Sequence, residues 1–227
     1  IDIDKLLDNL ASNNIIKVIK MEENKGLAFS RALAISNASN ELIAVMDSDD
    51  ICVQDRFEHQ IAEFSIAGTD LIGGWIEEFD VSPGDQGFIR KTPISYEDIY
   101  RAGKWRNPVN HVTLMFKKSS YNKIGGYLEL LANEDWEMIS RMLANGLNIR
   151  NVPKVLVHVR GGADMVERRR SSRQFWGEIK AFKLMHKSNY LTFAQYLRNV
   201  ALYSSIRILP ISFTVYLYRN ILRINLN

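Results

Sequence analysis

The sequence predicts an α/β fold, with a parallel or mixed sheet that carries helices on its faces. Apolar runs typical of strands, at Ile15–Met21, Leu42–Met46 and Val155–Val159, alternate with helical patterns such as Leu27–Ser39. An acidic tetrad follows one of these strands directly, at the place where open α/β sheets bind their ligands. The alternation of strands and helices favours a sheet covered by helices.

The first helices have local sequence support. Small residues on one face of Leu27–Ser39 suit close packing on a sheet. The pattern at Gln54–Phe64 places Phe57, Ile61 and Phe64 at helical spacing, which predicts an apolar face toward the core. Cys52, just before this helix, is interpreted as a small buried residue.

The later elements follow from apolar spacing and helix-ending residues. We expect a long strand or strand pair at Asp70–Phe79, a short helix near Tyr96–Ala102, a strand at His111–Lys117 and a helix at Asn133–Asn145. Gly146 ends that last helix, with Trp136, Ile139 and Leu143 facing inward. The remaining chain is helical in pattern and is broken at Pro210.

The tetrad Asp47-Ser48-Asp49-Asp50 is the most informative feature of the chain. Three carboxylates so close together repel one another unless a cation lies between them. Mg²⁺ takes oxygen ligands, typically one or two carboxylates together with substrate phosphates. The tetrad therefore indicates a metal-bound diphosphate.

The tetrad has two other possible interpretations. A solvated acidic turn after a strand is common and stays open from the tetrad alone. An EF-hand calcium loop is excluded, although Asp47, Asp49 and Glu58 have its ligand spacing. Ile51 occupies a ligand position of that loop, and Cys52 stands where the loop needs glycine.

Composition and charge fit one substantial core with an appended segment. The chain has 227 residues, of which 46% are hydrophobic, and a formal net charge of +3. From residue 167 onward there are eleven basic and two acidic residues, so the preceding part is acidic. This asymmetry predicts an acidic body with a basic tail that meets an anionic surface.

Other classes of protein are disfavoured by composition. The single cysteine excludes an internal disulfide framework and fits a reducing compartment. We find no signal peptide and no apolar run long enough to cross a membrane. The first residue is Ile1, which indicates a fragment or a processed chain.

Short segments along the chain match, in order, those of a known enzyme family. They are Asn24-Lys25-Gly26-Leu27-Ala28, Asp47-Ser48-Asp49-Asp50, Asp55-Arg56, Asn107-Pro108-Val109-Asn110-His111, Gly125-Gly126-Tyr127, Glu134-Asp135 and Val157-His158-Val159-Arg160. In this order they resemble family 2 glycosyltransferases, the inverting GT-A class with nucleotide-sugar donors. The stretch Gly161–Met165, followed by Arg168-Arg169, resembles the subgroup that builds bacterial surface polysaccharides of the amylovoran and O-antigen type.

The resemblance implies a GT-A fold, a Rossmann-like mixed sheet with helices on both faces, over residues 1–166. A basic amphipathic helical tail over residues 167–227 would follow it. Family members normally begin with two further strands inside the sheet, and we expect this sequence to lack them. Only the helix that follows them remains, at Asp4–Leu10.

The same resemblance assigns roles to individual residues. Asp47 and Asp49 would form an Asp-x-Asp site that holds Mg²⁺ or Mn²⁺, and Lys25 and Arg160 would join them in binding the donor nucleotide. Asp135 would be the catalytic base that deprotonates the acceptor hydroxyl. Helix capping is the alternative role of Glu134-Asp135, because acidic residues often occupy a first helical turn.

Four further residues would line the active site on the acceptor side: Glu134, Asn110, His111 and His158. The two histidines have an alternative role as core or strand residues. Asp50 has a structural role open to it as well, since it could stabilise the turn by accepting hydrogen bonds from backbone N–H groups. Arg160 or the Arg168-Arg169 pair would contact the diphosphate, because bidentate arginine geometry suits phosphate. The alternative for these arginines is a solvated basic face.

The expected partners are a nucleotide-sugar donor, UDP-linked, and a saccharide or polyprenyl-linked acceptor. The tail interleaves aromatic, aliphatic and basic residues, which is typical of amphipathic helices at an anionic membrane surface. We therefore expect a cytoplasmic protein, peripheral on the inner face of the cell membrane. Two core or dimer helices are the alternative for the tail.

Two other function classes were compared with the glycosyltransferase. A non-catalytic nucleotide- or membrane-binding remnant is the main alternative. Nucleic acid is not an expected partner, because the aromatic residues of the tail follow helical spacing and no nucleic-acid motif is present.

Overall fold

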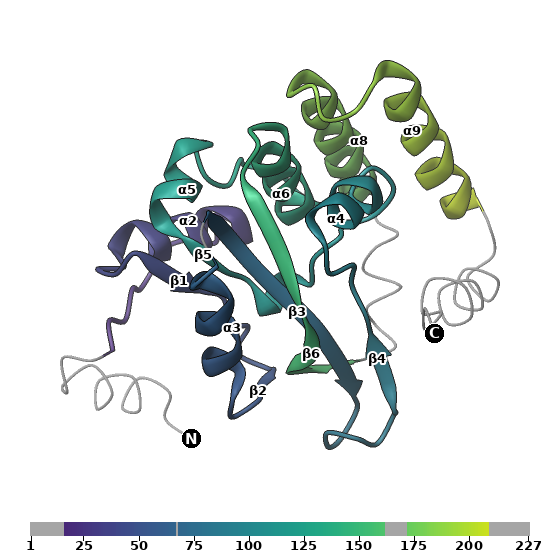
Figure 1. Ribbon diagram of the computed structural model, residues 1–227. Helices are drawn as coiled ribbons and strands as arrows, with labels where there is room; N and C mark the ends of the chain where they lie inside the picture. Colours follow the sequence, from purple (N-terminus) through teal and green to yellow (C-terminus); the bar gives the residue numbers. More distant parts are fainter. Residues whose placement is uncertain (1–15, 67, 162–171, 209–227) are drawn as a thin grey trace.

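A mixed sheet of six strands with helices packed against it forms the centre of the molecule (Figure 1). The structure is a computed structural model that describes residues 16–66, 68–161 and 172–208. The helices are α2 (Leu27–Asn37), α3 (Arg56–Phe64), α4 (Tyr96–Ala102), α5 (Lys118–Lys123), α6 (Glu134–Ala144), α8 (Ser172–Lys187) and α9 (Phe193–Ile208), with the 3₁₀ turn η1 (His111–Thr113). The strands are β1 (Leu42–Ala44), β2 (Ile51–Cys52), β3 (Thr69–Phe79), β4 (Phe88–Arg90), β5 (Met115–Lys117) and β6 (Asn148–Arg160).

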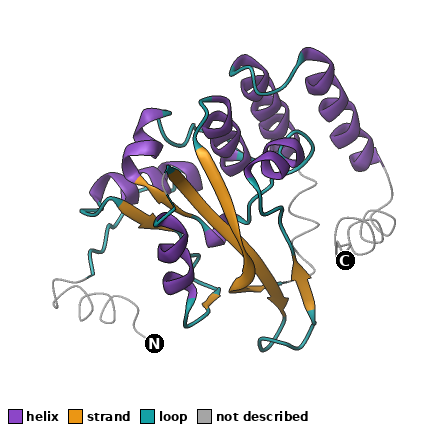
Figure 2. Cartoon of the chain, in the orientation of Figure 1, coloured by secondary structure: helices purple, strands orange, loops and turns teal. Residues whose placement is uncertain are grey.

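Strands β3 and β6 form the long parallel centre of the sheet (Figure 2). On one side β5 and then β1 extend it in antiparallel pairing, and on the other side β2 pairs antiparallel with β6. The remaining strand, β4, pairs with the C-terminal part of β3. The predicted α/β mixed sheet is confirmed.

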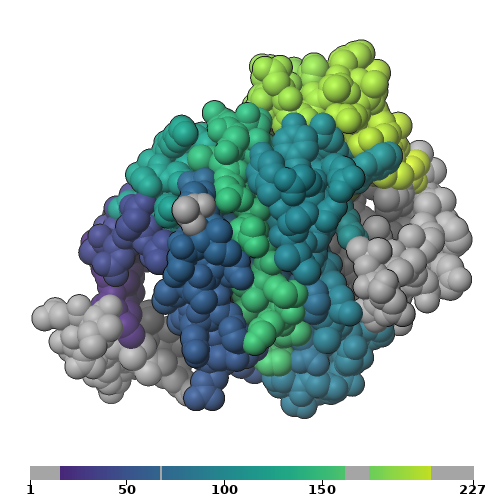
Figure 3. Space-filling view, viewed as in Figure 1, coloured from purple at the N-terminus to yellow at the C-terminus, as the bar shows by residue number. Residues whose placement is uncertain are grey.

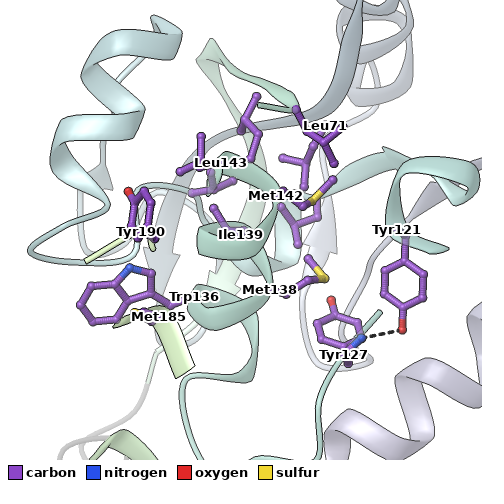
Figure 4. Close-up of a cluster of buried hydrophobic side chains, with 14 of the residues drawn as sticks. Leu71, Tyr121, Tyr127, Trp136, Met138, Ile139, Met142, Leu143, Met185 and Tyr190 are labelled. Carbon is purple, nitrogen blue, oxygen red and sulfur yellow. Dashed lines mark hydrogen bonds between the residues drawn. The ribbon is translucent and has the colours of Figure 1, made fainter. Parts of the chain in front are cut away.

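Helices cover both faces of the sheet, as the fold class requires. Successive strand side chains point to opposite faces, so Leu71 joins one hydrophobic cluster and its neighbour Ile72 joins the other. The larger cluster includes Trp136, Ile139 and Met142 of α6 (Figure 4). On the opposite face the smaller cluster is met by α3 through its last residue.

The first predicted strand does not form. Residues 16–21 pair with no other strand in the part of the chain that the structure describes, and Ile16 and Ile19 are 44% and 37% exposed. A strand needs a neighbouring strand for its backbone hydrogen bonds, and none of the described strands pairs with this segment. Ile15 and the predicted helix at Asp4–Leu10 lie outside the described residues.

The strand before the tetrad is shorter and more exposed than the apolar run predicts. Only Leu42–Ala44 is a strand, and it pairs on one side alone, with β5. As an edge strand it leaves Leu42 and Met46 exposed. Cys52 was expected to be buried, but it lies exposed in the short edge strand β2.

Helix α3 has the predicted position with the opposite face inward. Phe57 and Ile61 are 48% and 52% exposed, whereas Arg56 and Gln60 are buried. The polar pair is buried because its side chains hydrogen-bond to the main-chain carbonyl groups of Val45, Thr113 and Ile72. A hydrophobic pattern does not report this kind of burial.

Strand β3 is one continuous strand, and its pairing with β6 is irregular between Gly74 and Trp75. A Cβ at Gly73 would lie 2.2 Å from Val109 Cγ1 and 2.5 Å from Asn151 Oδ1, so no side chain fits there. These contacts bring the loop before η1 against the centre of the sheet.

The remaining central elements agree with prediction in most respects. The helix at Tyr96–Ala102 is confirmed, and so is α6, which is followed by Gly146 at a positive φ of 70°. The segment His111–Lys117 is only partly a strand, because η1 precedes β5. Strand β6 begins at Asn148, earlier than Val155, because it pairs along most of β3.

The predicted helical tail is confirmed over α8 and α9, and these helices share the main core. Phe182 and Met185 of α8 are fully buried, and the Phe182 ring meets Trp136 of α6 edge-on at 5.4 Å. The helices are separated at residues 188–192, with Asn189 at a positive φ of 61°, and Pro210 lies outside the described residues. Within the described ranges, no helix has the length and hydrophobicity that spanning a membrane requires.

Candidate active site

A cavity of about 470 Å³ lies between the acidic turn, the first turn of α6 and the first turns of α8. Of the residues predicted from sequence, Asp47, His111, Glu134 and Asp135 line it. They come from separate parts of the chain, and the sheet and its covering helices bring them together.

Asp47 is held at the cavity by the buried polar face of α3. Arg56 Nη2 donates to the carbonyl oxygen of Val45 at 2.9 Å, and its Nε donates to Gln60 Oε1 at 2.9 Å. Gln60 in turn donates to the carbonyl oxygen of Thr113 at 2.7 Å. These bonds fix the chain two residues before Asp47, so the position of the acidic turn depends on a buried arginine.

Arg31 of α2 connects the two acidic sides of the cavity. Its Nη1 lies 2.8 Å from Glu134 Oε1 and its Nη2 lies 3.3 Å from Asp47 Oδ1. The side chain is 18% exposed, so the guanidinium is a partly buried counter-charge inside the site. A planar guanidinium with several donors suits such a bridging position.

Asp135 is oriented by two hydrogen bonds, one to each carboxylate oxygen. Asn107 Nδ2 donates to Oδ2 at 2.7 Å, and the main-chain N–H of Trp136 donates to Oδ1 at 2.8 Å. Each oxygen keeps acceptor capacity for a further hydrogen bond. The arrangement suits a carboxylate that receives a proton from a bound hydroxyl group.

Glu134 differs from Asp135 in its surroundings. Burial, followed by the negative charge of Asp135, raises the pKa of Glu134 above its ordinary value, while the ion pair with Arg31 opposes the shift. The two adjacent carboxylates therefore differ: Glu134 is paired with an arginine, whereas Asp135 is held by neutral hydrogen-bond donors.

His111 is held beside these carboxylates by Tyr127. The distance between His111 Nε2 and the Tyr127 hydroxyl oxygen is 2.9 Å. Burial lowers the pKa of His111, Arg31 lowers it further, and Asp135 and Asp47 oppose the shift. A neutral imidazole near pH 7 follows, able to accept or donate one hydrogen bond in the cavity.

The acidic turn contains two carboxylates that can share a cation with a ligand. Asp49 is exposed, and Asp47 lines the cavity. Asp50 accepts the main-chain N–H of Arg160 at 3.0 Å. Burial, with the charges of Asp49 and Asp47 adding to it, raises the pKa of Asp50 to about 6.

Among the described residues, no cluster of three or more His, Cys, Asp or Glu side chains is poised to hold a metal ion. Mg²⁺ commonly takes one or two carboxylates and completes its shell with substrate phosphates. Asp47 and Asp49 therefore fit a cation shared with a diphosphate, and do not form a complete metal centre from the described side chains alone.

Lys25 and Arg160 do not line this cavity. Lys25 Nζ lies 3.2 Å from Glu23 Oε1 on the surface. The Arg160 guanidinium donates to the carbonyl oxygen of Asp80 at 3.2 Å and stacks over Phe79, 4.8 Å from the ring centroid. Arg160 donates to the acidic turn through its main-chain N–H, which Asp50 accepts.

Asn110 and His158 also lie away from the cavity. Asn110 is buried and donates from Nδ2 to the carbonyl oxygen of Gly74 at 2.8 Å, which ties η1 to β3. His158 stands in β6 with Nδ1 2.7 Å from Glu77 Oε2 on the neighbouring strand. Asn110 thus connects η1 with the sheet, and His158 connects two neighbouring strands.

Sequence reasoning assigned no role to several residues that line the cavity. Arg31 and Arg106 are the main examples, and Glu78, Arg90 and Glu178 line it as well. Arg31 could have been found, because it lies four residues after Leu27 and so on the same helical face as that matched segment. Arg106 lies in the loop after α4, and the others lie on β3, β4 and α8, whose arrangement around the cavity the sequence does not reveal.

Comparison with known proteins identifies relatives of the whole chain. Residues 3–125 match the family model described as glycosyl transferase family 2. The chain is 32% identical over 224 residues to the UDP-Gal:alpha-D-GlcNAc-diphosphoundecaprenol beta-1,3-galactosyltransferase of Escherichia coli, covering 98% of this chain and 81% of that protein. It is 29% identical to the amylovoran biosynthesis glycosyltransferase AmsE of Erwinia amylovora, covering 88% of this chain and 75% of that protein.

Solved structures share the fold at low sequence identity. TarS 1–349 of S. aureus in complex with UDP-GlcNAc matches with a TM-score of 0.61 at 16% identity, over 98% of this chain and 64% of that chain. The mannosyltransferase PcManGT from Pyrobaculum calidifontis, in complex with GDP-Man and Mn²⁺, matches with a TM-score of 0.56 at 14% identity, over 94% of this chain. The chain thus spans less than two thirds of these structures, since it covers 65% of PcManGT.

Proposed function

The chain belongs to glycosyl transferase family 2, and from this premise we propose that it transfers a sugar from a UDP-linked donor with inversion. The acceptor is a saccharide or polyprenyl-linked saccharide, in the biosynthesis of a bacterial surface polysaccharide. One observation carries the proposal: Asp135, oriented by Asn107, shares a cavity with Asp47 of the acidic turn. A non-catalytic remnant is not favoured, because it would have no need of this oriented carboxylate.

In the proposed reaction Asp135 accepts the proton of the acceptor hydroxyl. The hydroxyl oxygen forms a bond to the anomeric carbon of the donor sugar as the bond from that carbon to the diphosphate oxygen breaks. The electron pair of the broken bond leaves with UDP. Attack from the side opposite the leaving group inverts the configuration at the anomeric carbon.

Asp47 and Asp49 would hold a divalent cation, Mg²⁺ or Mn²⁺, together with the donor diphosphate. When bound, the cation neutralises negative charge on the leaving diphosphate. Arg31 keeps Asp47 and Glu134 paired and adds a fixed positive charge to the same cavity. Arg31 is only 18% exposed, which limits the screening of its charge by water.

The nature of the substrates is supported by the relatives. The E. coli relative is named for a UDP-linked donor and an acceptor on diphosphoundecaprenol. The TarS structure is named for its complex with UDP-GlcNAc. A UDP-sugar and a polyprenyl-linked acceptor are therefore the first pair to examine.

Incubation of the chain with radiolabelled UDP-sugars and a polyprenyl diphosphate-linked saccharide tests the function. We expect transfer of label to the acceptor, and a product whose anomeric configuration is opposite to that of the donor by NMR. Hydrolysis of the donor without transfer, or a product with retained configuration, would contradict the proposal.

Removing divalent cations is expected to abolish UDP binding, because the diphosphate and the carboxylates of the acidic turn repel each other without a cation. Calorimetric titration of UDP with Mn²⁺ and with EDTA measures this effect. Asp49→Ala should reduce the affinity in Mn²⁺ toward the value in EDTA. Glu58→Ala, a change of an acid on α3, is the matched control. The same UDP affinity in EDTA and in Mn²⁺ would refute a metal role for Asp49.

We also propose that α8 and α9 attach the protein to an anionic membrane surface on the cytoplasmic side. Along α8, Trp176, Lys180, Lys183 and Lys187 are exposed at helical spacing and form one stripe. On α9, Phe193 is 60% exposed and Leu197, one turn later, is 48% exposed. Figure 3 shows these two helices together at one end of the molecule.

The triple variant Lys180→Gln, Lys183→Gln and Lys187→Gln is expected to bind phosphatidylglycerol vesicles about 100-fold more weakly. Each basic residue near an anionic surface contributes about 1 kcal/mol, and about 1.4 kcal/mol corresponds to tenfold. Co-sedimentation at low and high salt measures the affinity. The matched control changes Lys117, Lys123 and Lys154 to Gln. Equal vesicle binding by the two triple variants would refute the proposal that the lysine stripe on α8 binds the membrane.

A further inference from the structure

A second cavity of about 520 Å³ adjoins the first at Arg106, which lines both. It lies between Trp75 of β3, the segment Lys91–Ile94 that follows β4, and α4. We call this cavity the Trp75 groove. Arg106 thus stands where the groove and the candidate active site meet.

The groove carries unpaired positive charge. Asp98 neutralises Arg101, with 2.7 Å between Oδ1 and Nη2, and Asp98 Oδ2 also accepts the Ser95 hydroxyl at 2.8 Å. Lys91 and Arg106 have no carboxylate partner in the part of the chain that the structure describes. Because Asp98 is taken by Arg101, these two cations remain in the groove lining without an ion pair among the described residues, which suits an anionic ligand.

The walls of the groove are largely apolar. Trp75, Pro93, Ile94 and Ala102 line it, and Ile94 is 42% exposed. The Trp75 indole N–H donates to the carbonyl oxygen of Thr92 at 3.2 Å, which fixes the ring, and Lys91 Nζ lies 5.3 Å from its centroid. These walls suit an anionic ligand that also carries an apolar group, because that group would be buried against them.

An unmet hydrogen-bonding group supports the same conclusion. The Thr92 hydroxyl is buried in the groove wall and has no hydrogen-bond partner within the described residues. Buried polar groups nearly always have a partner in the protein, in water or in a ligand.

The groove is connected to the proposed base through adjacent residues. Arg106 is followed by Asn107, whose side chain holds Asp135 at 2.7 Å. Consecutive Cα atoms are about 3.8 Å apart. Arg106, Asn107 and Asp135 all line the first cavity, so a ligand bound at Arg106 borders the cavity that contains the proposed base.

We propose that the Trp75 groove binds the diphosphate and the first isoprene units of a polyprenyl diphosphate-linked acceptor. This inference rests on the proposed function, in which the sugar of that acceptor enters the larger cavity. Lys91 and Arg106 bind the phosphate oxygens, and the apolar wall covers the start of the lipid chain. A membrane phospholipid offers similar chemistry, so the experiment includes it as a separate probe.

Calorimetric titration with farnesyl diphosphate in EDTA tests the groove directly. EDTA removes divalent cations, so farnesyl diphosphate cannot bind at the proposed cation-dependent site of the acidic turn. We expect Lys91→Gln and Arg106→Gln each to weaken binding about tenfold or more, the loss of one charge-assisted hydrogen bond. Lys123→Gln on α5 is the control and should bind like the unmodified chain. Farnesol and inorganic pyrophosphate should each bind more weakly than farnesyl diphosphate.

Three results would overturn the proposal: no binding of farnesyl diphosphate, equal binding by the unmodified chain and both variants, or displacement by dihexanoyl phosphatidylglycerol at equal concentration. The last result would assign the groove to a lipid headgroup.

Steady-state kinetics with two acceptors of the same sugar separates this inference from the proposed function. One acceptor is linked to farnesyl diphosphate and the other is a simple alkyl glycoside. Lys91→Gln should raise KM about tenfold for the first acceptor only. An equal rise in KM for both acceptors would refute the role of the groove in acceptor binding and would leave the proposed transferase function intact. If neither acceptor receives sugar, the proposed function fails, and the calorimetric result still decides the groove.

Discussion

Replacing Asp135 by Asn is expected to lower turnover by about 10²–10⁴-fold, the usual contribution of a general base, with donor affinity unchanged. The amide conserves volume and can still accept from Asn107, but it cannot take a proton from the acceptor. Turnover at saturating substrates and calorimetric UDP affinity are the two measurements. A loss in turnover alone assigns Asp135 to the chemical step.

The control for this variant is Glu129→Gln, an acid-to-amide change in the loop before α6 outside the cavity. It should keep normal turnover. Near-normal turnover of Asp135→Asn would instead leave this carboxylate with the role of capping the first turn of α6, where its Oδ1 accepts the N–H of Trp136.

Arg56→Met is expected to cost about 3 kcal/mol of unfolding free energy, since methionine fills the space but donates no hydrogen bonds. The carbonyl oxygen of Val45 and the side-chain oxygen of Gln60 lose their donor, and each unpaired buried group costs about 1–3 kcal/mol. For a chain of this size the midpoint of thermal unfolding should fall by roughly 6–12 °C. Catalytic efficiency should fall as well, because Val45 leads into the acidic turn.

Arg150→Met is the matched control for this stability effect. Arg150 pairs with Glu63 at 3.2 Å and is 33% exposed, so its loss should cost no more than about 1 kcal/mol. Equal destabilisation by the two variants would refute the assigned role of Arg56, because Arg150 is partly exposed and pairs only with a surface carboxylate.

Elements with local signals could be predicted from the sequence. The helix α6 has regular apolar spacing and Gly146 after its end, and α4 begins with a Ser95 cap that accepts the N–H of Asp98. Edge position has no local signal. The apolar runs at Ile15–Met21 and Leu42–Met46 look the same in sequence whether neighbours cover them or not, and here residues 16–21 and β1 are largely exposed.

Helix α3 and the cavity also contain features that local sequence patterns do not reveal. The period of α3 was predicted, yet its inward face was wrong, because the buried side chains of Arg56 and Gln60 find main-chain acceptors far along the chain. In the cavity, the order of short segments predicted that Asp47, Glu134 and Asp135 converge. Arg31 was missed because its role depends on how α2 lies across the sheet.

Trp136 anchors α6 to both C-terminal helices, and this affects how a deletion of those helices can be interpreted. Its indole N–H donates to the carbonyl oxygen of Gly103 at 2.7 Å, and its ring lies 5.4 Å from Phe182 of α8 and 5.9 Å from Tyr203 of α9. The residue next to the proposed base is therefore wedged between both C-terminal helices. Deleting those helices to obtain a membrane-free enzyme would remove the support of Asp135 along with any lipid contact. An inactive deletion mutant would then say nothing about membranes, whereas charge substitutions on the surface of α8 leave the wedge in place.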